Sequence, residues 1–169
     1  MGLLTFAVVA LMAVLAAICQ PAIAQTLSLG VVFPDVATTC LVVAGLLLGP
    51  TEALVIGFVV GLISVTQMGH VGLGGVLVSR CLVGLLAGHA SARVYMNSGL
   101  AQVGVVLAGV LAGETVLFAF NPDPSVFPWL WAALGRALLS ALVAPVFFRI
   151  ANGMAAWELG DAHRPSLGG

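Results

Sequence analysis

Long apolar stretches, interrupted by short segments with glycine, proline or a charged residue, run along almost the whole chain. Of its 169 residues, 62% are hydrophobic and 7% are charged, whereas about a quarter of the residues are charged in soluble domains. So few charges cannot cover a surface that faces water, which excludes a water-soluble globule. We therefore expect an integral membrane protein.

The apolar stretches divide into six segments, each close to the ~20 residues that a membrane-spanning helix needs. Gly49 and Pro50 must divide one stretch, because an unbroken helix over residues 36–68 would be about 50 Å long in a hydrocarbon core of about 30 Å. The sequence thus predicts an all-α, polytopic bundle of six transmembrane helices with short loops, similar to the bundles of transporter substrate-binding subunits. The predicted helices cover residues 3–24, 29–48, 53–68, 71–92, 100–120 and 127–150 of a single domain over residues 1–157, and residues 158–169 are expected to form a flexible cytoplasmic tail.

The end of the first segment looks like a signal-peptidase site, with Ala22, Ile23 and Ala24 before Gln25. However, its apolar run exceeds the roughly 7 to 15 residues of a signal-peptide core, and no lysine or arginine precedes it. We therefore interpret this segment as the first helix of the bundle.

Arginines at the helix ends predict the orientation of the bundle in the membrane. Arg93, Arg149 and Arg164 all fall on one side under this division, and positive residues collect on the cytoplasmic side. Six crossings would then place both termini in the cytoplasm. Trp129 and Trp131 would lie at the outer interface, where amphipathic rings are enriched.

Several function classes lack the residues that they need. The net charge is −1 and the chain has no lysine, so no basic patch for nucleic acid is expected. No hydrolase or phosphate-loop motif and no pair of intramembrane carboxylates is found, so we expect neither catalytic residues nor enzyme activity. The cysteines and histidines are too scattered to predict a metal or cofactor site. They are Cys19, Cys40, Cys81, His70, His89 and His163.

Three charged residues are expected inside the hydrocarbon, namely Arg80, Glu114 and Arg136. Counted from the expected outer helix ends, they lie roughly 13, 9 and 13 Å deep. A lone charge at this depth costs on the order of 3 kcal/mol, so we predict that the three form one cluster. The favoured interpretation is a lock that holds three helices in register, but one carboxylate cannot neutralise two guanidinium groups, which leaves a functional role open. Nearby hydrogen-bonding side chains would be Ser79, Thr115 and Ser140.

Glycine pairs recur at a spacing of four residues, which places both members on one helix face. Without side chains, helix backbones approach closely and gain van der Waals contact. These glycines can serve packing inside the bundle, which we favour, or docking of a partner helix. They are Gly45 and Gly49, Gly57 and Gly61, Gly84 and Gly88, and Gly109 and Gly113.

Three parts of the chain resemble the rod shape-determining protein MreD family, over about residues 34–152. The similar residues are Pro34 and Asp35, Gly49 and Pro50, the segment Gly57-Phe58-x-x-Gly61, Gly69 and Gly72, the pair Gly84 and Gly88, and the segment Ala141-Leu142-Val143-Ala144-Pro145-Val146-Phe147-Phe148-Arg149, which is similar to the family's Ala-Pro-x-x-Phe segment. The sequence departs from the family at Val65, where many members carry an aspartate in the third helix.

The resemblance implies a non-enzymatic membrane subunit of the bacterial cell-elongation complex, which synthesises peptidoglycan and determines rod shape. Such a subunit acts as a scaffold for MreC, for RodA and its transpeptidase partner, and indirectly for MreB. Under this reading Pro34 and Asp35 would be available to periplasmic partners, and Arg93 and Arg149 to cytoplasmic ones.

An alternative is the substrate-binding S-component of an energy-coupling-factor vitamin transporter, which is also a six-helix bundle of this size. Ala13 and Ala17 resemble the small-residue motif with which such subunits dock their coupling protein. A vitamin site would also need convergent polar groups that open outward, and the outer halves of the predicted helices offer few.

Overall fold

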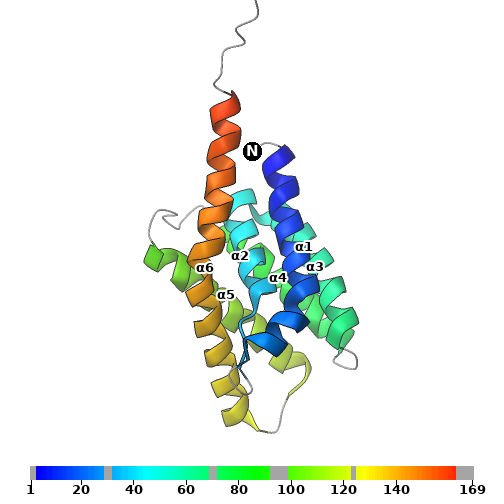
Figure 1. Cartoon of the computed structure of the whole chain (residues 1–169). Coiled ribbons are helices and arrows are strands. Elements are labelled where there is room, and N and C mark those ends of the chain that lie inside the picture. Colours follow the sequence, from blue (N-terminus) through cyan, green and yellow to red (C-terminus); the bar gives the residue numbers. More distant parts are fainter. Residues whose placement is uncertain (1–2, 29–31, 69–71, 92–98, 123–124, 163–169) are drawn as a thin grey trace, which may run out of the picture.

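The computed structural model describes residues 3–28, 32–68, 72–91, 99–122 and 125–162, and for residues 3–4, 68 and 154–162 it describes the backbone alone. The described residues form one compact bundle of six helices (Figure 1). The all-helical bundle predicted from the sequence is therefore confirmed. The helices are α1 (Leu3–Thr26), α2 (Val36–Leu48), α3 (Pro50–Met68), α4 (Leu73–Ala90), α5 (Gly99–Phe120) and α6 (Val126–Ala162).

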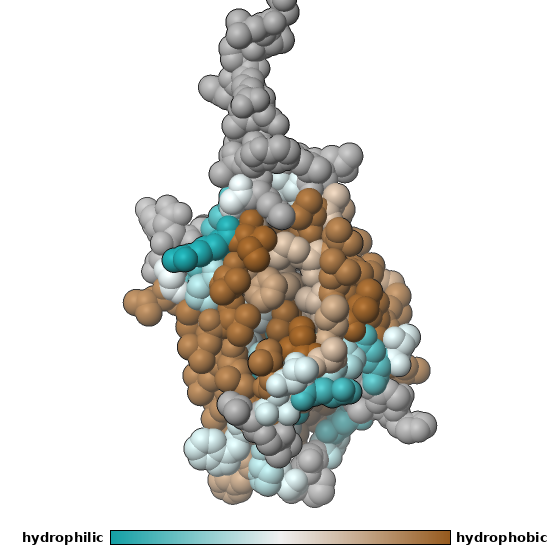
Figure 2. Space-filling model, in the orientation of Figure 1, coloured by the Kyte–Doolittle hydropathy of each residue, from teal (hydrophilic) through white to brown (hydrophobic). Residues whose placement is uncertain are grey.

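Five of the described helices, all except α2, are long and apolar enough to cross a membrane. Figure 2 shows the matching surface, where an apolar middle region separates hydrophilic patches near the upper and lower margins. The first residue of α1 and the last turns of α6 lie at the same end of the molecule (Figure 1). The described helices therefore have the character of a multi-pass membrane protein.

Helix α2 begins at Val36, seven residues later than the start predicted at residue 29. Pro34 disfavours a helical conformation at Phe33 and cannot donate a backbone hydrogen bond. Asp35 then caps the helix, because its side chain accepts a hydrogen bond from the backbone N–H of Thr38. The resulting helix has 13 residues and is about 20 Å long, which is shorter than a hydrocarbon core of about 30 Å.

Helix α2 lies at the centre of the bundle and contacts each of the other five described helices. Every residue from Val36 to Leu46 is buried. A short helix with a non-helical approach is tolerated at membrane depth only when protein surrounds it, because lipid offers no hydrogen bonds to the backbone. The other helices provide this cover.

The last helix differs from its prediction at its C-terminal end. We expected α6 to end near residue 150 and a flexible tail to start at residue 158, but α6 continues to Ala162. Residues 151–162 contain alanine, leucine, methionine and glutamate, which favour helix, and no proline before Pro165. At 37 residues α6 is about 55 Å long, which exceeds a hydrocarbon core of about 30 Å.

Glycines at the helix contacts let α4 approach α2 and α3 closely. A Cβ atom at Gly45 would lie 2.7 Å from the Cβ of Ala87, and one at Gly57 would lie 2.6 Å from the carbonyl oxygen of Arg80. Added Cβ atoms at Gly61, Gly84 and Gly88 would also collide with a neighbouring helix.

Of the other three predicted packing glycines, two lie where α5 contacts its neighbours and one lies in a turn. A Cβ atom at Gly109 would lie 2.7 Å from Val42 of α2, and one at Gly113 would lie 3.2 Å from the hydroxyl of Ser79 in α4. Gly49 has a backbone φ of 104°, a conformation that side chains disfavour, and it allows the tight turn into Pro50 at the start of α3. All eight glycines thus serve contacts or a turn within the chain.

Replacing Gly57 by alanine should destabilise the fold by about 1–3 kcal/mol, because the new methyl group would force α3 away from α4. Gly104→Ala in α5 is the matched control, since a Cβ atom there meets nothing within 4 Å. Alanine is favoured over glycine in a helix, so the control should be neutral or slightly stabilising. Unfolding of the purified proteins in mixed detergent micelles measures the difference, and equal stability of the two variants would contradict the close approach.

Candidate functional site: a buried layer of four charged residues

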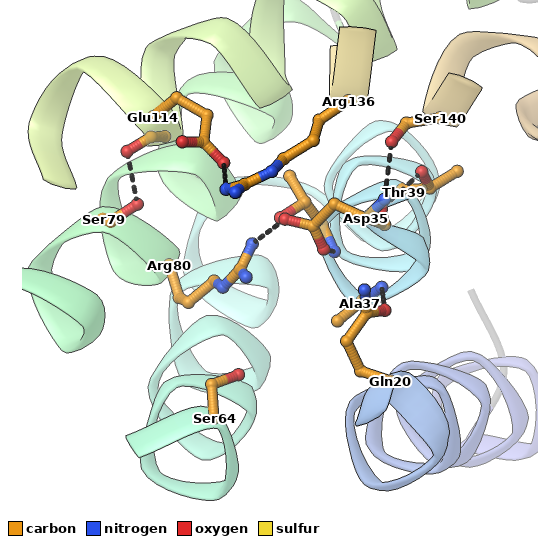
Figure 3. Close-up of polar contacts among 12 residues, drawn as sticks. Gln20, Asp35, Ala37, Thr39, Ser64, Ser79, Arg80, Glu114, Arg136 and Ser140 are labelled. Carbon is orange, nitrogen blue, oxygen red and sulfur yellow. Dashed lines mark hydrogen bonds and ion pairs between the residues drawn. The ribbon is translucent and has the colours of Figure 1, made fainter. Parts of the chain in front are cut away.

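Four charged side chains point toward one another inside the bundle (Figure 3). Arg80 of α4 donates from Nη1 to Oδ2 of Asp35, the residue before α2, at 2.9 Å. Arg136 of α6 donates from Nη1 to Oε1 of Glu114 in α5, also at 2.9 Å. The two ion pairs balance in charge, so each carboxylate is matched by one guanidinium group.

This arrangement corrects the predicted cluster of Arg80, Glu114 and Arg136. We expected Glu114 to serve both arginines and the unpaired charge to need water, helix carbonyls or a partner subunit. Asp35 of the same chain supplies the second carboxylate instead. The expectation that the chain has no pair of buried carboxylates is therefore wrong, because Asp35 and Glu114 both lie in this layer.

Asp35 and Pro34 were expected at the periplasmic surface, and both are buried. The resemblance to the MreD family implies a surface position for both residues, at the point where the second helix opens. In the structure the segment before α2 runs into the bundle and carries Asp35 to the level of Arg80. The sequence pattern Pro34-Asp35-x-x-Thr38 is typical of a helix start and could have indicated where α2 begins. The pattern does not show how deep in the bundle that helix start lies, because this depends on the path of the chain.

Side chains from α1 and α6 complete the hydrogen bonds at the start of α2. Ser140 Oγ accepts the N–H of Asp35 at 2.8 Å, and Gln20 Oε1 accepts the N–H groups of Val36 at 3.1 Å and Ala37 at 3.3 Å. Gln20 also donates from Nε2 to the carbonyl oxygen of Pro34 at 2.9 Å. The backbone donors at this buried helix end therefore all have acceptors, which a helix start away from water requires.

The carboxylate of Asp35 has three donors around it. Oδ1 accepts the N–H of Thr38 at 2.9 Å, and Oδ2 accepts the Thr38 hydroxyl at 2.6 Å in addition to Arg80. A carboxylate at a helix N-terminus is also favoured by the helix dipole. The helix cap and the ion pair thus share one side chain, and its loss would leave the Thr38 N–H and the Arg80 guanidinium group without this acceptor.

The two ion pairs differ in how much of their side chains is exposed. The side chains of Arg80 and Asp35 are 6% and 11% exposed, whereas that of Arg136 is 26% exposed and that of Glu114 is 9% exposed. The guanidinium carbon of Arg136 lies 4.8 Å from the ring centre of Phe33, a cation–π contact. The Nε atoms of both arginines are buried without an acceptor among the described residues.

The expected hydrogen-bonding neighbours take different roles. Ser140 binds the Asp35 backbone, as described above, and Ser79 donates to the carbonyl oxygen of Gly113 at 2.9 Å, which joins α4 to α5. Thr115 donates to Leu111 in its own helix and lies outside the layer. Gln20 was missed, because a single glutamine in an apolar helix gives no sign of its partner.

None of the remaining candidate residues that the structure describes takes part in either ion pair. Arg149 is exposed on α6, and Arg93 lies outside the described residues. Cys19, Cys40 and Cys81 are free thiols. Within the described ranges, no group of three or more histidine, cysteine, aspartate or glutamate side chains is arranged to hold a metal ion.

A groove of about 690 Å³ lies between α4 and α5. Its lining consists of valine, leucine, alanine and glycine only, so it contains no polar side chain that could orient a ligand. Lining residues include Val83, Ala87, Gly104, Ala108 and Ala112.

No family model, curated protein or solved structure matches this chain. The resemblance to the MreD family therefore stays a prediction.

The pairing predicts a specific pattern of coupling between substitutions. Removing one partner of a buried ion pair costs about 3–5 kcal/mol, because the other charge is left unpaired. Asp35→Asn and Arg80→Gln should therefore cost less together than the sum of the single changes, and so should Glu114→Gln and Arg136→Gln. Unfolding free energies in detergent micelles measure both couplings.

The control for this prediction is Arg80→Gln with Arg149→Gln. Arg149 is exposed on α6 and takes part in neither ion pair, so the two effects should add to within about 0.5 kcal/mol. Couplings for the two observed pairs that are no larger than in this control would contradict the pairing.

Proposed function

We propose that this chain is a non-enzymatic integral membrane subunit of the bacterial cell-elongation complex and acts there as a scaffold. The observation that carries the proposal is the charge layer. Its two carboxylates and two guanidinium groups are matched to each other, and its hydrogen bonds hold α2 against α1, α4 and α6. A carboxylate held in an ion pair is poorly placed for acid or base chemistry.

Because the charged groups inside the bundle bind each other, the outer helix faces and the loops are the surfaces that can bind partner proteins. A scaffold needs no more than these surfaces. The motifs resembling MreD support the particular assignment, and on that basis the proposed partners are MreC, RodA with its transpeptidase partner and, indirectly, MreB. The proposed location is the inner membrane.

The vitamin-transport alternative receives less support. A vitamin site combines an apolar pocket with a few polar groups that orient the ligand. The groove between α4 and α5 offers only aliphatic side chains and glycine among its lining residues. Mass spectrometry of the purified protein tests the alternative, since a copurifying vitamin would favour transport over scaffolding.

Depleting the protein in its host should convert rods into round cells, because elongation would lose a scaffold subunit. Cell length and width, measured by microscopy, report the effect, and expression of the wild-type chain from a second copy should restore rods. A pull-down of the native complex should recover MreC and RodA. Unchanged rods after depletion would exclude the elongation role.

The proposed location also makes a prediction about topology. With the native cysteines replaced, a single cysteine placed before α1 and another placed after α6 should both resist a membrane-impermeant thiol reagent in intact cells and react after lysis. A cysteine placed at Asn121, between α5 and α6, should react in intact cells. Labelling of the two chain ends from opposite sides of the membrane would contradict the six-crossing arrangement.

A further inference from the structure

We draw no further inference here: the strongest candidate, the apolar groove between α4 and α5 with the small residues Gly104, Ala108 and Ala112 along its α5 side, carries nothing because nothing in the structure shows what covers it.

Discussion

The structure depends on a helix that starts inside the bundle, where the other described helices cover its first residues. The first N–H groups of any helix have no partners within it, and lipid supplies none. At α2 the side chains of Asp35, Gln20 and Ser140 provide the missing acceptors. The capping carboxylate brings a negative charge into the bundle, and Arg80 balances that charge. The positions of α1, α4 and α6 around α2 thus follow from one requirement.

Close packing and the charge layer support each other. The carbonyl oxygen of Arg80 lies where a side chain at Gly57 would otherwise be, so the glycine brings α3 against the turn of α4 that carries the buried arginine. Gly113 serves in the same way on α5, where its carbonyl oxygen accepts the hydroxyl of Ser79, next to Arg80. Small residues therefore bring the backbones together at the level where the charges are paired, and the ion pairs then fix the register of the helices.

Much of the fold could be predicted from the chain alone. The scarcity of charge required a membrane environment, and Gly49 with Pro50 required a break between two helices. The predicted cluster of Arg80, Glu114 and Arg136 was wrong in its pairing, since Asp35 serves Arg80 and Glu114 serves Arg136 alone. Two boundaries were less predictable, since the start of α2 depends on a cap inside the bundle and the end of α6 on weak preferences of residues 151–162.

The order of the apolar segments along the chain determined the all-helical class, the number of helices and the presence of charges that must be paired. Only the tertiary structure decided which charges pair. The partners are more than twenty residues apart in the sequence, so the path of the backbone determines whether they meet. Hydrophobic periodicity carries no information on that path when helices are apolar on all sides. The non-helical residues before α2 illustrate the point. They move Asp35 from an expected surface position to the centre of the bundle, where it serves Arg80 and leaves Glu114 to Arg136.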